Sequence, residues 1–294
     1  MQTNGSYTEK LNTYVRYTIE CGVKPFEVFL QPISDCYGGE AIAYRALIRV
    51  NSVISGALDP NDYLFSISDE EVAVQLGRRI VKKAIAALRV LEEGNVPCKM
   101  LFVRCPQALL FCPDLYVRLK ALLAESDATA ANNNAANGNN GGNGNKYVNA
   151  IGKKLCLEFD GGITSETGSR LSEGFAAIRA AGCKTAIYGY GGEAFSIESL
   201  LTSCPDYLFL DERVASFAVD REKRATVAPL VNLAKSLGGE VIASGVASDD
   251  ELREFRSRDC FAFIPDANYK GTSDAPRAIK TAEQIVFEGG SHER

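Results

Sequence analysis

The sequence has only one histidine, and this scarcity limits the chemistry that the fold can perform. The residue is His292, and it lies in the polar C-terminal tail Gly289–Arg294. Histidine is the usual general base near neutral pH and a common metal ligand. Catalytic triads and metal sites that depend on histidine are therefore excluded inside the fold. An active site would have to use carboxylates, lysine, tyrosine or cysteine.

Long apolar runs and an excess of positive charge are also missing. Met1–Gly5 is polar, and no apolar run approaches the roughly 18 residues that a spanning helix needs. We therefore expect a cytoplasmic protein without a secretory signal. The formal net charge of −5 leaves no broad cationic surface, which argues against nucleic acids and anionic membranes as partners but leaves a local basic pocket possible.

The cysteines form no recognisable pattern. There are nine of them, an odd number, and no Cys-x-x-Cys pair occurs. This argues against both a disulfide framework and a zinc ribbon. We expect buried, reduced thiols that act as small hydrophobic side chains.

Short apolar runs alternate with helical patterns along the chain, and 294 residues with 46% hydrophobic content can bury one large core. The predicted strands are Phe26–Leu30, Ile42–Ile48, Met100–Val103, Leu155–Phe159, Thr185–Ile187, Tyr207–Leu210, Glu240–Ala243 and Phe261–Ile264. The predicted helices lie near Glu70–Glu92, which a Ser68/Glu71 capping box should start, and near Pro106–Glu125, Gly168–Ala181, Phe195–Thr202, Glu222–Leu237, Asp249–Ser257 and Ala275–Phe287. This alternation predicts an α/β fold, a TIM-like (β/α)8 barrel over residues 26–288, with an N-terminal helix in residues 1–25 and a tail at 289–294.

One segment breaks the alternation. Asp127–Lys146 consists almost wholly of Asn, Gly and Ala. It has too little apolar surface to offset the entropy of ordering, so we predict a disordered insertion at 127–146 that can be shortened without loss of the fold.

Seven motifs, in order, resemble those of EAL domains, the cyclic di-GMP phosphodiesterase family. They are FEVFLQPI at Phe26–Ile33, AYRALIR at Ala43–Arg49, FVRCPQALL at Phe102–Leu110, LCLEFDGG at Leu155–Gly162, AAGCKTAIYGYGGEAFS at Ala180–Ser196, PDYLFLDERV at Pro205–Val214 and VIASGVAS at Val241–Ser248. The resemblance covers roughly residues 10–285 and implies a barrel of the EAL type. It also implies a mechanism in which two divalent ions at the strand ends hydrolyse a phosphodiester.

The residues that the resemblance assigns to this chemistry are mostly replaced. The former site positions carry Arg45, Arg104, Glu158, Tyr188, Gly189, Phe209, Asp211 and Ser244, and the glutamine after the last strand corresponds to Ile264. Among them, Glu158 and Asp211 alone keep their type. Hard divalent ions need convergent oxygen ligands, and guanidinium groups repel them, so we predict no metal, no cofactor and no hydrolysis.

The two arginines need counter-charges if they are buried. We predict that the retained carboxylates supply them, with Arg104 paired to Glu158 and Arg45 paired to Asp211. Of these two contacts, Arg104 to Glu158 is the better supported, because the two residues end successive strands.

Three functions remain open. The first is a non-enzymatic regulatory or scaffolding protein that binds another protein. The second is a cyclic di-GMP receptor that binds weakly without hydrolysis, because Gln31, Leu47 and Arg49 match family positions that contact the dinucleotide. The third is an enzyme with a repurposed site, whose chemistry would have to come from Tyr188, Tyr190, Cys105, Glu158 or Asp160, although their spacing forms no known nucleophile and base pair.

Overall fold

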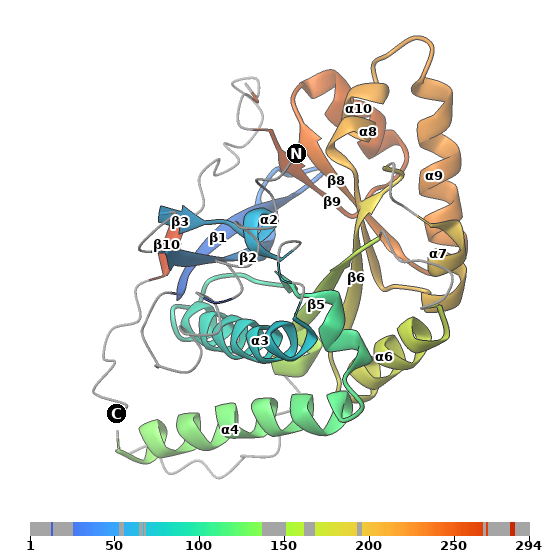
Figure 1. Ribbon diagram of the computed structural model, residues 1–294. Helices are drawn as coiled ribbons and strands as arrows, with labels where there is room; N and C mark the ends of the chain where they lie inside the picture. The colour runs from blue at the N-terminus through green and yellow to red at the C-terminus, as the bar shows by residue number, and fades with distance from the viewer. Residues whose placement is uncertain are drawn as a thin grey trace.

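The structure is a computed structural model (Figure 1), and it describes residues 13, 26–52, 56–64, 67, 69–136, 151–161, 168–192, 196–266, 269 and 283–285. The predicted N-terminal helix in residues 1–25 and the tail at 289–294 therefore lie outside the described residues, apart from Thr13, which is helical.

Eight of the described strands close into a barrel, as predicted. They are β1 (Phe26–Asp35), β2 (Ala41–Ser52), β4 (Leu101–Arg104), β5 (Leu155–Asp160), β6 (Lys184–Tyr190), β7 (Tyr207–Leu210), β8 (Glu240–Val246) and β9 (Ala262–Pro265). The order around the barrel is β1-β9-β8-β7-β6-β5-β4-β2, and β1 closes the ring by pairing with β2. β1 runs antiparallel to both neighbours, and the other strands pair in parallel. All eight predicted strands are present at or near their predicted positions.

Two short strands extend the sheet beyond the ring. β3 (Gly56–Leu58) pairs with β2, and β10 (Glu283–Ile285) pairs with β1. Together they form an antiparallel wing, β10-β1-β2-β3, at one side of the barrel (Figure 1). The helix predicted near Ala275–Phe287 is wrong over Glu283–Ile285, because the open edge of β1 supplies backbone partners that a helix would not use. The rest of that predicted helix lies outside the described residues.

The described helices lie outside the barrel. They are α2 (Pro60–Tyr63), α3 (Glu70–Glu93), the 3-10 helix η1 (Gln107–Phe111), α4 (Leu115–Ala136), α6 (Gly168–Ala180), α7 (Ile197–Ser203), α8 (Glu212–Phe217), α9 (Arg224–Ser236) and α10 (Asp249–Ser257). None of them is both long and apolar enough to cross a membrane. The N-cap of α3 is Asp69, whose side chain accepts from the Val72 N–H at 3.1 Å, so the predicted Ser68 cap is wrong by one residue.

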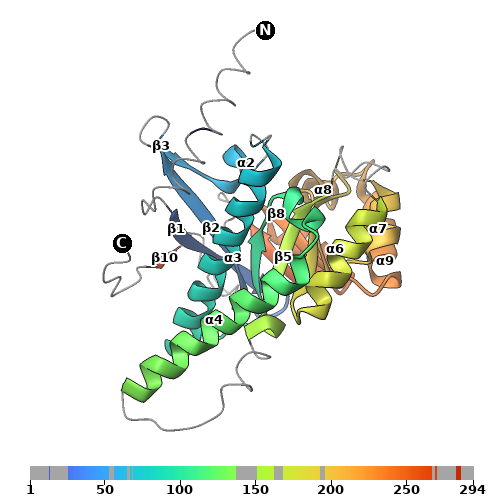
Figure 2. The same ribbon diagram turned by 60° about the horizontal axis from the view of Figure 1, so that its bottom comes forward.

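The helix predicted at Pro106–Glu125 is divided in two. η1 ends at Phe111 and α4 begins at Leu115, because Pro113 lacks an N–H and keeps the preceding Cys112 in an extended conformation. α4 then runs beside α3 (Figure 2) and continues to Ala136. The predicted disorder is therefore wrong for residues 127–136, where half of the residues are alanine and a helix already formed is easily extended. Residues 137–146 lie outside the described residues.

Alternation along the strands separates the core into an inner and an outer part. The inner cluster fills the barrel and includes Phe102, Phe209 and Ile242. The Phe102 ring packs edge-on against Phe209 and against Tyr207, with 5.0 Å between ring centroids in each case. Residues of opposite parity, such as Leu101 and Val103, pack outward against the helices. The interior of the barrel is therefore filled by apolar side chains, both aliphatic and aromatic.

Candidate functional site

The sequence-predicted site residues meet at the carboxyl ends of the barrel strands, where barrels of this kind keep their sites. Arg45 lies on β2, Arg104 on β4 and Glu158 on β5, and these strands are neighbours in that order. Arg104 and Glu158 are paired in register. Each of the three residues is two positions from an inward-facing residue of its strand, so all three side chains point into the barrel.

Glu158 binds both arginines at once. Its Oε1 accepts from Arg104 Nε at 3.2 Å, and its Oε2 accepts from Arg45 Nε at 3.1 Å. The side chain of Glu158 is fully buried, and those of Arg104 and Arg45 are 7% and 6% exposed. The Arg104–Glu158 pair predicted from the sequence is thus confirmed, and Glu158 proves to be a shared counter-charge.

Aromatic rings cover the faces of both guanidinium groups. The Arg104 carbon Cζ lies 3.7 Å from the centroid of the Tyr188 ring, and the Arg45 Cζ lies 4.1 Å from that of Phe209. Arg45 is also 5.5 Å from the Tyr188 centroid. Cation–π contacts of this kind are strongest when desolvated, so the Tyr188 and Phe209 rings stabilise the buried Arg104 and Arg45 guanidinium groups.

The cluster carries more positive than negative charge. Burial lowers the pKa of Arg45, and Glu158 offsets this effect only in part. Burial alone would also lower the pKa of Arg104, but Glu158 and Tyr188 outweigh it and the pKa ends above its ordinary value. Arginine stays protonated in either case. Two buried cations therefore share one buried anion, and Arg45 Nη2 is a buried donor without a hydrogen-bond partner.

Asp211 does not pair with Arg45, and that prediction is wrong. Its carboxylate accepts from Arg213 Nε at 2.9 Å and from the Arg213 N–H at 3.0 Å, so it caps α8. Burial opposes ionisation of Asp211, but the contacts with Arg213 outweigh it and hold the pKa of this carboxyl below its ordinary value. A carboxylate at a helix N-terminus accepts the free N–H groups of the first turn, which an inward rotamer would leave unsatisfied.

Gly189, Ser244 and Ile264, the remaining positions that the resemblance assigns to the site, carry neither a carboxylate nor an imidazole. Gly189 adopts a left-handed backbone with φ of 77° at an irregularity in the β6–β7 pairing, a conformation that favours glycine. Ser244 is 1% exposed, and Ile264 belongs to the inner core. Both oxygens of Glu158 are already used by guanidinium groups, and among the described residues no three His, Cys, Asp or Glu side chains come together as a metal site. The donor set therefore does not fit the divalent ions that the resemblance implies.

The residues expected to contact a dinucleotide lie on the wing. Leu47 and Arg49 share a face of β2 with Arg45, and Gln31 is the β1 partner of Arg45 in the register. All three are partly exposed. The Arg49 guanidinium is 4.2 Å from the centroid of the Phe29 ring, and its Nε donates to Asp59 Oδ1 at 2.5 Å. Arg49, one of the residues expected to contact a dinucleotide, is therefore paired with a carboxylate in this structure.

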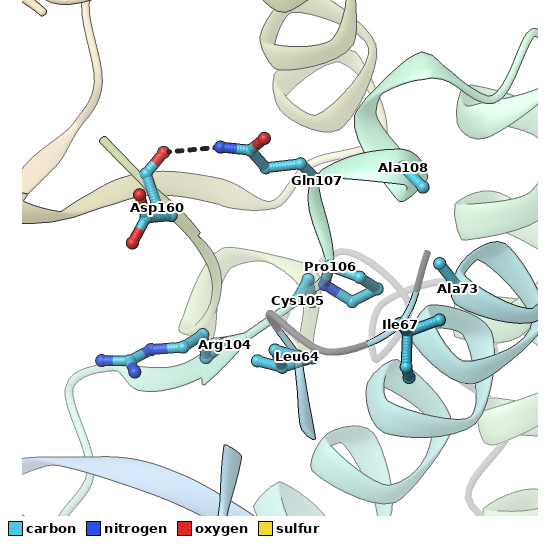
Figure 3. A pocket seen from close by; sticks show the side chains of 9 residues that line it. All are labelled: Leu64, Ile67, Ala73, Arg104, Cys105, Pro106, Gln107, Ala108 and Asp160. Atoms are coloured by element: carbon cyan, nitrogen blue, oxygen red, sulfur yellow. Dashed lines mark hydrogen bonds between the residues drawn. The ribbon is translucent and has the colours of Figure 1, made fainter. Parts of the chain in front are cut away.

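Beside the arginine cluster is a cavity of about 300 Å³, which the sequence did not predict (Figure 3). Its lining is as polar as it is apolar and consists of Leu64, Ile67, Ala73, Arg104, Cys105, Pro106, Gln107, Ala108 and Asp160. Gln107 closes one side by donating to the Asp160 carbonyl at 3.3 Å. Asn61, the first residue of α2 after its proline, is a further contact that the sequence did not reveal, because its side-chain oxygen accepts from Arg104 Nη1. The Asp59-Pro60 helix start was the available signal for it.

Tyr190 and Cys105, two of the residues considered for a repurposed enzyme, are buried groups with raised pKa values. Tyr190 donates its hydroxyl to the Leu230 carbonyl at 2.7 Å, and burial raises its pKa to about 12. Burial raises the pKa of the Cys105 thiol too, and the neighbouring Glu158 raises it further. Neither group is activated for attack, since a reactive thiol needs a lowered pKa.

Comparison with known proteins agrees with this architecture. Residues 147–264 match the family model of the EAL domain. An uncharacterized protein of Azorhizobium caulinodans is 22% identical over 257 residues, which are 85% of this chain and 32% of that protein. This chain thus spans about a third of the length of that curated relative.

Several solved structures have the same fold. The EAL enzyme Bd1971, in its form bound to cAMP and cyclic di-GMP, matches 90% of this chain and 66% of its own, with a TM-score of 0.70 and 19% identity. The S helix-GGDEF-EAL portion of Vibrio cholerae LapD, bound to cyclic di-GMP, matches 88% of this chain and 56% of its own, with a TM-score of 0.65 and 16% identity. The Xanthomonas citri FimX EAL domain, in complex with cyclic di-GMP, matches 90% of this chain and 94% of its own, with a TM-score of 0.64 and 18% identity. Residues 147–264 thus match the EAL domain model, and the closed barrel has the fold of these solved EAL structures.

Proposed function

We propose that this chain is a non-enzymatic regulatory or scaffolding protein built on an EAL-type barrel, and that it acts through contacts with other proteins. The observation that carries the proposal is the double engagement of Glu158 by Arg45 and Arg104, at 3.1 and 3.2 Å, inside the barrel mouth. The position that would have to ligate a metal is instead the counter-charge of two arginines.

The energetics favour keeping this arrangement. Separating Glu158 from either arginine would leave a buried charge uncompensated, which costs about 3–5 kcal/mol. A divalent ion would also approach two guanidinium groups at close range, where repulsion in a low-dielectric site is large. Metal binding would therefore require the cluster to be rebuilt, and with it the stacked Tyr188 and Phe209 rings.

The proposal is tested with the purified chain, cyclic di-GMP, and magnesium or manganese. We expect no hydrolysis above a buffer blank, measured by chromatography of the products, under conditions in which an active EAL phosphodiesterase gives complete turnover. The Arg45→Glu variant should remain inactive as well, because Arg104, Tyr188 and Phe209 would still occupy the site. Metal-dependent turnover by the wild-type chain would overturn the proposal.

Partner contact needs its own experiment. The tagged chain would be used for affinity capture from its native host, and each captured protein would then be purified and tested for a direct binary complex by size-exclusion chromatography. We expect a stable complex without added nucleotide. Failure of every captured protein to form a binary complex would count against the scaffolding role.

A second candidate function is a cyclic di-GMP receptor that binds without hydrolysis. The observation that favours it is the excess positive charge of the arginine cluster, together with the partly exposed Arg49, which lies on β2 like Arg45. LapD and FimX are described in complex with cyclic di-GMP, and their barrels are similar to this one. Calorimetry with the dinucleotide, with and without magnesium, distinguishes the two functions: metal-independent binding in the micromolar range would favour the receptor.

A further inference from the structure

One edge of β1 pairs with two different strands, β9 near its end and β10 near its start. The pairing with β10 is short. β2 pairs with β1 from Phe26 to Ser34. On the opposite edge, β9 pairs with Ser34 and Asp35, and β10 pairs with Val28 to Leu30. Within the described residues, β10 is thus the sole strand that pairs with the Phe26–Gln31 edge, and its pairing spans three residues. This edge lies on the side of the barrel that carries the wing (Figure 1).

The covered edge belongs to a firmly held strand. Val28 and Leu30 are buried in the core beneath α3, and Phe29 lies on the opposite face under the Arg49 guanidinium. The edge is therefore a rigid row of backbone donors and acceptors, whether or not β10 is paired to it. Rigid strand edges of this kind are the templates that extended peptides join.

β10 is a modest competitor for this edge. Its pairing spans Glu283, Gln284 and Ile285, so it forms few ladder bonds, and each contributes little net stability because water can replace it. The register sets Glu283 opposite Leu30 and Ile285 opposite Val28. An incoming strand with apolar residues at both of these positions would have more apolar surface to bury than the sequence of β10 offers.

We propose that the Phe26–Gln31 edge of β1 is a docking site for an extended segment of a partner protein, and that β10 is the internal strand that the partner displaces. The partner segment is at least as long as β10 and has apolar residues at alternate positions. This inference rests on the proposed function, since it gives the mode of the protein contact.

The test uses the full chain and a labelled synthetic peptide with the sequence of residues 280–288, in which valine replaces the residue corresponding to Glu283. Binding is measured by fluorescence anisotropy to three proteins: wild type, the Glu283→Pro/Gln284→Pro variant, and the Glu283→Ala/Gln284→Ala control. Successive N–H groups of a strand point to opposite sides, so one of the two prolines must remove a ladder bond to β1. We expect the proline variant to bind the peptide at least tenfold more tightly than the wild type and the alanine control do.

Equal binding by all three proteins, or no binding by the proline variant, would overturn the proposal. A second measurement on the wild type decides the case if the proline variant does not fold. Saturating peptide should slow hydrogen exchange of the Phe26–Leu30 amides at least threefold, and unchanged exchange would be a refutation. These assays contain neither dinucleotide nor metal. Hydrolysis of cyclic di-GMP by the chain would therefore overturn the proposed function without altering the peptide-binding result. Absence of peptide binding would overturn the docking site and leave a non-enzymatic function standing.

Discussion

Replacing Glu158 by glutamine should destabilise the protein strongly. The amide is nearly isosteric with the carboxylate, so the change removes charge from the cluster and little else. Arg45 and Arg104, each less than a tenth exposed, would then be two buried cations without a counter-charge. Breaking a buried pair costs about 3–5 kcal/mol, and total stability is on the order of 5–15 kcal/mol, so we expect a loss of about 4 kcal/mol.

Urea denaturation followed by circular dichroism measures this loss. Asp211→Asn is the matched control, because Asp211 also pairs with an arginine but near the surface, and we expect it to cost about 1 kcal/mol. Arg45→Met in the Glu158→Gln background should recover part of the stability, since it removes one of the orphaned charges. A Glu158→Gln protein within about 1 kcal/mol of the wild type would refute the reasoning, because it would mean that the arginines are neutralised in another way.

Three further predictions concern other parts of the barrel. The pKa of Asp206 lies below its ordinary value, because contacts with the start of β6 outweigh its burial. The stabilisation is therefore present at neutral pH and lost as the pH falls through the lowered pKa. Asp206→Asn should destabilise the protein by about 1–3 kcal/mol at pH 7, and by much less at a pH below that pKa, in denaturation curves. A difference independent of pH would contradict this. Among the described cysteines Cys204 is exposed, Cys112 is partly exposed, and the others are buried, with raised pKa values for thiols such as Cys156, Cys183 and Cys260. Cys204→Ser should therefore remove the fastest phase of labelling by a thiol reagent among these cysteines, and rapid labelling of a buried thiol in the folded protein would be the opposite result. A Cβ at Gly174 would lie 2.6 Å from the Leu110 carbonyl oxygen, so Gly174→Ala should lower the free energy of unfolding by about 1–3 kcal/mol, as measured by thermal unfolding. Gly38 lies in an exposed turn, so Gly38→Ala is the control and should be nearly neutral. Equal effects of the two substitutions would refute the packing argument.

The parallel strands β4 to β9 were predictable because each one carries a short apolar run of consecutive buried residues. Tyr207–Leu210 is such a run, and its predicted bounds coincide with β7. The end of α4 was not predictable from composition, because the Asn- and Ala-rich sequence after Asp127 is compatible with both disorder and helix extension. The strand at Glu283–Ile285 depends on an edge supplied by residues more than 250 positions earlier in the chain, which no local pattern could indicate.

The candidate site was predictable where register alone decides the contact. Arg104 and Glu158 lie opposite each other on adjacent strands, so their pairing follows from the order of the strands. The partner of Arg45 depended on rotamers instead. The Asp211 side chain accepts a hydrogen bond from an N–H group in the first turn of α8, close to it in the sequence. It therefore does not extend across the barrel to Arg45.

The pairing of β1 with β9 also constrains how the protein is made. Ser34 and Phe263 are neighbours in the sheet, and Arg256 donates to the Cys36 carbonyl at 2.8 Å across a separation of 220 residues. Contacts between such distant positions form late, because a long loop must close before they contribute any stability. A nascent chain would hold β1 and β2 as an unclosed sheet until β9 leaves the ribosome, so chaperone dependence and aggregation during synthesis should concentrate in that interval.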